Sequence, residues 1–324
     1  VGMNMRFLKN FELDVTYYNA KTMNQTFNPE LPVGEYARIY IQTGAVRNQG
    51  LELALNYNNT WKDFTWNTGV TYSMNKNKIL TLADNAINPI TGEKFSISSL
   101  NMGGLGSTRF ILKEGGSMGD IYSLMDLKRD ANGAVYIDEN NSVVTESLEA
   151  NNYIKLGSVL PKGNLAWRNN FSWKNINVAF LVSARLGGVV FSRTQAVLDN
   201  FGVSEASAAA RDKGYVSVNG NDRVNPEGWY SVVAGGTAVP QYYIYSATNI
   251  RLQEASIGYT IPRKWLGNVC DIKVSLIGRN LWMIYNKAPF DPESVASTDN
   301  FYQGIDYFMM PSLRNIGFNL SFKF

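Results

Sequence analysis

Few of the reactive side chains in this sequence stand in a pattern that supports catalysis. Histidine is absent from all 324 residues, which removes the commonest general base and the commonest metal ligand. Asp291 and Glu293 suggest the paired carboxylates that hydrolyse glycosidic bonds. They lie two residues apart around Pro292, however, and are better interpreted as a turn carrying surface charge. We therefore expect no catalytic residue and no enzyme activity.

Metal and cofactor binding is also poorly supported by the sequence. Asp130, Asn132 and Asp138 lie near Gly133, as in a calcium-binding loop, but the glutamate that closes an EF-hand is missing at the required spacing. The single cysteine, Cys270, cannot form an internal disulfide and is interpreted as a small apolar residue on a strand. We expect neither a metal nor a cofactor.

Binding chemistry is more plausible in the longest loop, because aromatic side chains gather there. Such rings can stack on the sugar rings of a substrate, contact a partner protein, or pack within the loop itself. The candidate contact residues are Trp229, Tyr230, Tyr242 and Tyr243. The net charge of +3 comes without a long basic run, so nucleic acid is not an expected partner.

The closing segment has the clearest alternation of apolar and polar residues. Since successive side chains of a strand point to opposite faces, one face of this strand is wholly apolar and the other is polar or small. The apolar face, which we expect to contact lipid, comprises Ile316, Phe318, Leu320, Phe322 and Phe324. The opposite face carries Asn315, Gly317, Asn319, Ser321 and Lys323.

The same alternation recurs along the chain and predicts about ten strands, none needing a long apolar run. Their expected ranges are 1–8, 11–24, 42–59, 62–80, 108–124, 163–174, 176–190, 246–261, 269–283 and 312–324. Short links near Lys9, Trp61, Asn175 and Pro262 alternate with long connections over 25–41, 81–107, 125–162, 191–245 and 284–311. Short turns at one end and long loops at the other are typical of an outer-membrane barrel.

Three local features refine this picture. The apolar face changes phase within 249–261 and again within 271–282, as a β-bulge would cause. Residues 204–212, followed by Gly214, predict a short surface helix with a glycine stop. Aromatic residues at strand ends suit a girdle at the membrane surface: Tyr17, Tyr18, Trp61, Trp173, Trp265, Trp282 and Tyr285.

Several short motifs, in order along nearly the whole chain, resemble those of SusC/RagA-type TonB-dependent transporters. Three lie in the C-terminal third, at 278–282, 291–293 and 311–314, ahead of the closing strand. The upstream matches are Asn48–Gln49–Gly50–Leu51–Glu52, Asn75–Lys76–Asn77–Lys78–Ile79, Gly157–Ser158 with Pro161–Lys162, and Arg251–Leu252 through Gly258–Tyr259–Thr260–Ile261–Pro262.

The resemblance implies an all-β, antiparallel transmembrane barrel of about 22 strands with a plugged lumen. We therefore expect residues 1–324 to be the C-terminal part of that barrel, with the plug, the TonB-contacting segment and the first strands outside this sequence. The first and last strands should then pair with strands that are not in this sequence. The implied location is the bacterial outer membrane.

The function implied by the resemblance is TonB-dependent import of a large nutrient, either a glycan or an oligopeptide. The implied partners are a SusD-like surface lipoprotein acting as a lid, TonB through the absent N-terminal part, outer-membrane lipid, and the substrate itself. A passive porin or an outer-membrane adhesin is an alternative that shares the barrel. A soluble β-sandwich binding module, such as a lectin, is a third hypothesis.

Overall fold

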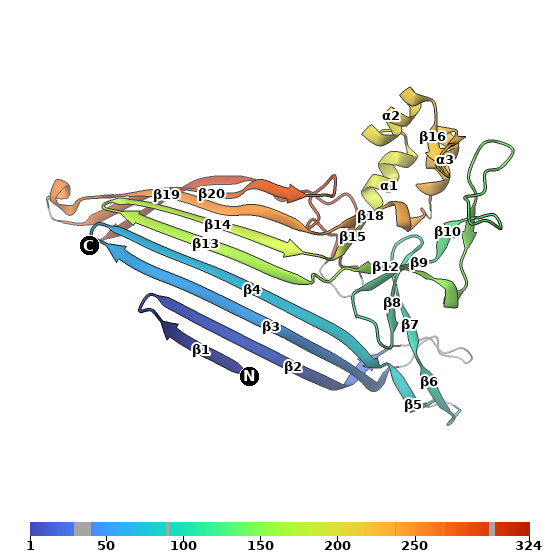
Figure 1. The fold of residues 1–324 in the computed structure, drawn as a ribbon, viewed down its shortest axis with the longest axis horizontal. Helices are drawn as coiled ribbons and strands as arrows, with labels where there is room; N and C mark the ends of the chain where they lie inside the picture. Colours follow the sequence, from blue (N-terminus) through green and yellow to red (C-terminus); the bar gives the residue numbers. More distant parts are fainter. Residues whose placement is uncertain (29–39, 89–90, 237, 268, 298–301) are drawn as a thin grey trace.

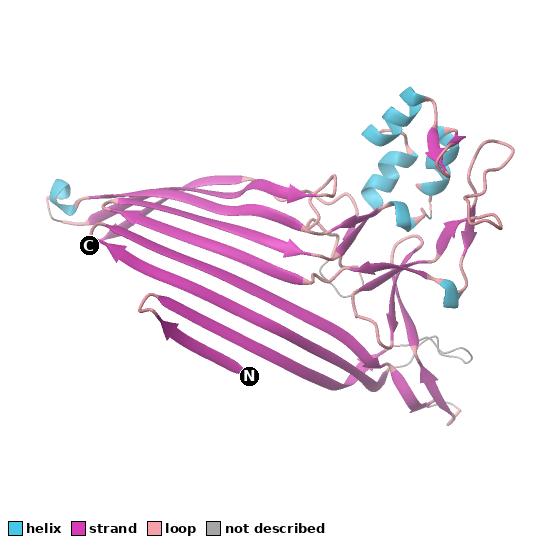
Figure 2. Cartoon of the chain, in the orientation of Figure 1, coloured by secondary structure: helices cyan, strands magenta, loops and turns pink. Residues whose placement is uncertain are grey.

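A computed structural model describes residues 1–28, 40–88, 91–236, 238–267, 269–297 and 302–324. Its main feature is one large antiparallel sheet, which runs across the molecule in Figure 1. All but one of the described helices, together with most of the short strands, gather at one end of this sheet, as the colours of Figure 2 show. None of the described helices is both long and apolar enough to cross a membrane.

The described residues form a nine-stranded sheet in which each strand pairs with the next one in the order β1-β2-β3-β4-β13-β14-β19-β20-β22. All these pairings are antiparallel. The strands are β1 (Gly2–Phe7), β2 (Phe11–Phe27), β3 (Ile41–Trp61), β4 (Phe64–Thr81), β13 (Gly163–Trp173), β14 (Ile176–Leu186), β19 (Asn249–Ile261), β20 (Asp271–Asn286) and β22 (Asn315–Lys323).

The connections confirm the predicted asymmetry between the two ends of the sheet. Lys62 and Lys174 have positive φ, at 54° and 50°, and open two-residue turns between β3 and β4 and between β13 and β14. The link from β19 to β20 contains the 3₁₀ turn η3 (Arg263–Leu266). These turns lie at the end opposite the helices in Figure 1, together with the C-terminus. The described residues within 82–162, 187–248 and 287–314, at the other end, form what we call the loop assembly.

One predicted wall strand was wrong. Residues 108–124 form two short strands, β8 (Thr108–Lys113) and β9 (Asp120–Ser123), within a separate four-stranded sheet of the loop assembly. Phe110, Ile111 and Leu112 are all buried, without the alternation of a strand that has one wet face. The two long connections predicted on either side of this segment are therefore parts of one, from 82 to 162.

Both predicted phase slips are confirmed as irregularities in pairing. Gln253 has no partner of its own on β14, where Leu181 pairs with Glu254 and the next residue pairs with Leu252. On β20, Asn280 and Leu281 both lie opposite Gln253, and Asn280 has a φ of 51°. Bulges of this kind turn the side chains beyond them to the other face. The expected disruption therefore lies where the sequence pattern placed it.

The loop assembly consists of short elements. Its strands are β5 (Ala83–Ile87), β6 (Lys94–Ile97), β7 (Ser99–Gly103), β10 (Met125–Leu127), β11 (Thr145–Ser147), β12 (Ile154–Ser158), β15 (Val189–Ser192), β16 (Val216–Val218), β17 (Asp222–Val224), β18 (Ile244–Ser246) and β21 (Ile305–Asp306). Its helices are α1 (Arg193–Asn200), α2 (Glu205–Lys213), α3 (Pro226–Val233), η1 (Ala150–Asn152) and η2 (Pro240–Tyr242). The predicted helix with a glycine stop is α2, where Ser204 caps the N-terminus and Gly214 ends the helix with φ 82°.

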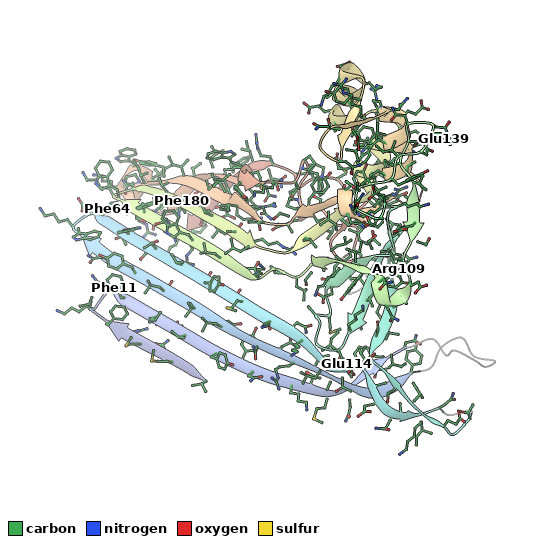
Figure 3. All side chains as sticks on the ribbon, turned by 45° about the vertical axis from the view of Figure 1, so that its right-hand side comes forward. Phe11, Phe64, Arg109, Glu114, Glu139 and Phe180 are labelled. Carbon is green, nitrogen blue, oxygen red and sulfur yellow. The ribbon has the colours of Figure 1, made fainter. Side chains whose placement is uncertain are left out.

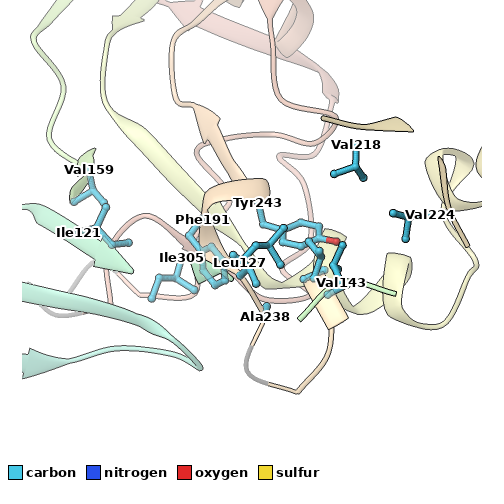
Figure 4. Close-up of a cluster of buried hydrophobic side chains, with 14 of the residues drawn as sticks. Ile121, Leu127, Val143, Val159, Phe191, Val218, Val224, Ala238, Tyr243 and Ile305 are labelled. Atoms are coloured by element: carbon cyan, nitrogen blue, oxygen red, sulfur yellow. The ribbon is translucent and has the colours of Figure 1, made fainter. Parts of the chain in front are cut away.

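The larger buried hydrophobic cluster lies in the loop assembly and not against the sheet. Figure 4 shows Phe191, Tyr243 and Ile305 meeting there with residues from several connections. The sheet, in contrast, keeps large hydrophobic side chains exposed along its length. The side chains in Figure 3 show the same contrast between the open wall, which carries Phe11, Phe64 and Phe180, and the crowded loop assembly.

Candidate functional site: the two faces of the sheet and the loop assembly

The outer face of the sheet is defined by the apolar residues of the closing strand. Residues that pair on neighbouring strands point to the same face, so the pairing extends this apolar face across the sheet in continuous rows. One row joins Phe318, Leu276, Ile257, Val178, Phe171 and Trp66. The next joins Leu320, Val274, Tyr259, Ile176, Trp173, Phe64 and Trp61. Phe318 is 76% exposed and Ile257 is 54% exposed, so this face needs a covering that the described residues do not supply.

Aromatic rings form a line along this face near the short turns. Phe7 stacks on Phe11 at 5.3 Å between ring centroids, and Phe11 lies 4.7 Å from Tyr57. The line continues through Trp66 and Phe171 to Phe180. Among the predicted girdle residues, Trp61, Trp173 and Trp265 lie at this same end of the sheet and are 47%, 54% and 66% exposed. Rings with one polar atom suit the boundary between hydrocarbon and water.

Two polar residues interrupt the apolar rows, and neighbouring indoles donate hydrogen bonds to them. Trp66 Nε1 donates to Asn169 Oδ1 at 3.1 Å, and Trp167 Nε1 donates to Thr68 Oγ1 at 3.1 Å. Thr68 Oγ in turn donates to the carbonyl of Arg168. Asn169 is 1% exposed. The indoles therefore satisfy one oxygen of each polar residue, which lipid could not hydrogen-bond, whereas Asn169 Nδ2 is buried without a partner among the described residues.

The inner face carries the polar half of the alternation. Cross-strand ion pairs lie on it, including Arg6–Glu12 at 3.2 Å and Arg279–Glu254 at 3.1 Å. A hollow of about 490 Å³ crosses this face and is lined by Asp14, Glu52, Thr71, Asn164, Arg185 and Glu293, among others. Hydrogen-bond donors and hydrogen-bond acceptors therefore both lie on the inner face, as a water-filled or plugged lumen requires.

The carboxylates that suggested catalysis instead hold a loop to the wall. Arg251, on β19, is 5% exposed at its side chain, and its Nη2 lies 2.9 Å from Asp291 Oδ1 and 3.3 Å from Glu293 Oε2. The Ser312 amide donates to the second Asp291 oxygen at 3.3 Å. Burial acts to raise the pKa of Asp291, but hydrogen bonds from Ser312 and Arg251 outweigh it and hold the pKa below its ordinary value. We call Arg251, Asp291, Glu293 and Ser312 the latch.

Several of the motifs that resemble the family pattern meet at or beside the latch. Asn280, in the motif at 278–282, donates through Nδ2 to the Leu313 carbonyl at 3.1 Å and accepts from Gln253 Nε2 at 3.2 Å. Residues around 251, 280, 291 and 312 thus converge at the loop end of β19 and β20. The motifs are visible in the sequence, whereas the contacts by which Arg251 joins two of them are visible only in the fold.

The four candidate aromatic residues have different environments. Tyr243 is 2% exposed, and its hydroxyl donates to Asp199 Oδ2 at 2.9 Å; burial, followed by the Asp199 charge, raises its pKa. Trp229 packs against the buried cluster and meets Tyr242 edge-on at 5.2 Å. Tyr230 lines a hollow of about 560 Å³ between the helices, and Tyr242 is 39% exposed. Tyr243 is therefore the buried member of the four, whereas Trp229 and Tyr230 are partly exposed and Tyr242 is exposed.

In the candidate calcium loop, the carboxylates of the two aspartates accept hydrogen bonds from backbone amides of the loop itself. Asp130 Oδ1 accepts the amides of Asn132 and Ala134, and Asp138 Oδ1 accepts the amides of Asn140 and Ser142. These are two successive turns in which an aspartate side chain closes the loop. Within the described ranges, no group of three or more acidic or cysteine side chains is arranged to hold a metal ion.

Comparison with known proteins supports the family resemblance. No family model matches the chain. The whole chain is 26% identical to TonB-dependent receptor P3 of Formosa agariphila, of which it covers 33%, and 96% of it is 27% identical to TonB-dependent receptor P26 of the same organism, of which it covers 32%. The chain therefore spans about a third of the length of these curated relatives.

Solved structures agree on the fold. The RagAB peptide importer in its closed-closed state matches all of this chain with a TM-score of 0.72 at 17% identity, and 35% of that chain is covered. Its open-open state matches 98% of this chain with a TM-score of 0.67 at 17% identity, covering 33% of that chain. The resemblance to SusC/RagA-type receptors and the all-β antiparallel fold are thus confirmed. Because these relatives are receptors and importers, the expectation that the chain is not an enzyme is also confirmed.

Proposed function

We propose that this chain forms part of the wall of a bacterial outer-membrane transporter that imports a large nutrient, a glycan or an oligopeptide, in a TonB-dependent process. The observation that carries the proposal is the separation of the sheet into an apolar outer face and a polar inner face. Soluble proteins rarely leave so extended an apolar surface uncovered. In a membrane, lipid covers the outer face and the inner face lines the transport path.

We further propose that residues 1–324 are the C-terminal part of a larger barrel. In the described residues, β1 pairs only with β2 and β22 only with β20, so these two strands are the edges of the sheet and do not pair with each other. An exposed strand edge has no hydrogen-bond partner in lipid. Additional strands, a plug and the TonB-contacting segment would complete the barrel, in line with the threefold greater length of the relatives.

The loop assembly is the part we propose to meet a SusD-like surface lipoprotein and the substrate. It has its own buried cluster and stands at the end of the wall where long extracellular loops are expected. The latch holds residues 287–314 of the assembly against β19 and therefore fixes this surface relative to the lumen. Of the four candidate aromatic residues, we propose that Trp229, Tyr230 and Tyr242 are available for contact, because Tyr243 is buried.

Energy coupling distinguishes this proposal from a passive porin, which would share both faces of the wall. We would delete the gene for the intact protein and measure growth on a set of oligosaccharides and oligopeptides, each given as the sole nutrient; growth on one of them should be lost. Loss of TonB, with the transporter still present in the outer membrane, should have the same effect. Growth that persists without TonB would instead support a porin, and unchanged growth after the gene deletion would support an adhesin.

A further inference from the structure

The outer face contains one hollow that differs in chemistry from those on the inner face and in the loop assembly. It has a volume of about 470 Å³ and lies across β14, β19, β20 and β22. Its outward-facing lining is aliphatic or aromatic and includes Val178, Phe180, Leu252, Leu276, Leu281 and Ile316. We call this hollow the outer groove.

Small residues and the bulge create the outer groove. Ala255, which pairs with Gly278, forms its floor, because the alanine methyl leaves the space above the backbone open, whereas the Leu281 side chain lies over Gly278. Register places Phe180 beside Ala255 and Ile316 beside Gly278, so these two larger residues stand at the ends of the same row. The row from Phe180 to Ile316 spans three strand spacings, or about 14 Å. Leu252 and Leu281, on the far side of this row, flank the phase slip at Gln253.

The distance of the outer groove from the short turns determines which leaflet of the membrane it contacts. On β14 the groove extends from Val178 to Val182, which pairs with the lining residue Leu252. These residues lie two and six positions beyond Ile176, the first residue after a short turn. At about 3.3 Å per residue and a tilt of about 40°, this range is roughly 5–15 Å from the turns, within an apolar band about 25 Å tall. Short turns face the periplasm. The outer groove therefore opens mainly into the inner leaflet, which is built from phospholipid.

We propose that the outer groove is a fixed binding site for one acyl chain of an inner-leaflet phospholipid. The inference rests on the proposed membrane location. An acyl chain is the expected occupant because the groove is continuous with rows of exposed apolar residues on the face that we propose contacts lipid. A smooth wall lets acyl chains slide past, whereas a recess with end walls holds a chain in place. The side chains that stand on either side of the recess restrict the chain to one position, so we expect the lipid to remain bound through gentle purification.

Native mass spectrometry of the intact receptor, purified from outer membranes in mild detergent, tests the proposal. Wild type should carry one adduct with the mass of a phospholipid. Ala255→Leu fills the floor of the groove and should reduce that adduct to background, and the smaller Ala255→Val should reduce it in part. Val70→Leu is the matched control, because Val70 lies on β4, outside the groove, and is 38% exposed. The Val70→Leu variant should carry the same amount of phospholipid adduct as wild type.

The outcomes separate this inference from the proposed function. Equal adducts in Ala255→Leu and wild type, no adduct in wild type, or an adduct with the mass of lipid A would each overturn the assignment, provided that the receptor is folded in the outer membrane by heat-modifiable mobility. If wild type itself is not found in the outer membrane, the proposed function fails first. Ala255→Val, which adds two carbons where leucine adds three, keeps the test valid if Ala255→Leu does not fold.

Discussion

Arg251→Met is expected to free residues 287–314 from the wall. The substitution leaves the carboxylate of Asp291, 8% exposed at its side chain, without its cationic partner. Removing one member of a buried pair costs about 3–5 kcal/mol, which corresponds to a change of roughly 150- to 4,000-fold in a local opening equilibrium. Hydrogen exchange at the amides of Ser294 and Ala296, which donate to Asp291 and Ile305, should accelerate by that factor.

Arg279→Met is the matched control for the latch. Arg279 pairs with Glu254 at 3.1 Å, but both side chains are exposed, at 67% and 43%. Exposed pairs contribute less than about 1 kcal/mol, so exchange in 287–314 should change little. Equal acceleration by Arg251→Met and Arg279→Met would mean that the buried pair does not hold this segment.

The same segment should respond to acid in a defined direction. The pKa of Asp291 is lowered in the folded protein, so its contribution to stability is fully present above the ordinary aspartate pKa of about 3.9. That contribution is lost as the pH falls through the lower folded value. Wild type should therefore be more protected than Asp291→Asn at neutral pH, and the difference should disappear only in acid below about pH 3.9.

Phe318→Arg is expected to impair assembly of the intact receptor in the outer membrane. Phe318 lies near the middle of β22 on the apolar face and is 76% exposed in this chain. An arginine on the lipid face near the bilayer midplane costs roughly 2–4 kcal/mol. Leu320→Arg should behave similarly. Asn319→Arg, which places the same charge on the inner face, is the control and should cost less, as heat-modifiable gel mobility of the three variants would show.

The strands of the large sheet could be predicted from the sequence because the alternation that defines them lies within each strand. Each strand has one apolar and one polar face, so alternate residues carry the information, and even the slips at Gln253 and Asn280 are visible as changes of phase. Two-residue turns and the helix ended by Gly214 are local features as well. The strand predicted at 108–124 failed because Phe110, Ile111 and Leu112 form a continuous apolar run, which indicates burial on both sides.

The latch and the loop assembly could not be predicted in the same way. Arg251 and Asp291 are forty residues apart, and nothing in the spacing of their neighbours indicates that they meet. Tyr243 and Tyr242 are adjacent in the sequence, yet one is buried against Asp199 and the other is exposed. These environments depend on how three connections pack together, and composition alone does not specify such contacts.

Site-directed spin labelling along β22 tests the central claim, that the outer face of this sheet contacts lipid, most directly. In a Cys270→Ala background, single labels at residues 315–322 of the intact receptor in bilayers would be probed for collisions with oxygen, which dissolves in lipid, and with a water-soluble nickel complex. Accessibility to oxygen should peak at 316, 318, 320 and 322 and fall at 315, 317, 319 and 321. An absence of this two-residue period, or the opposite phase, would contradict the account.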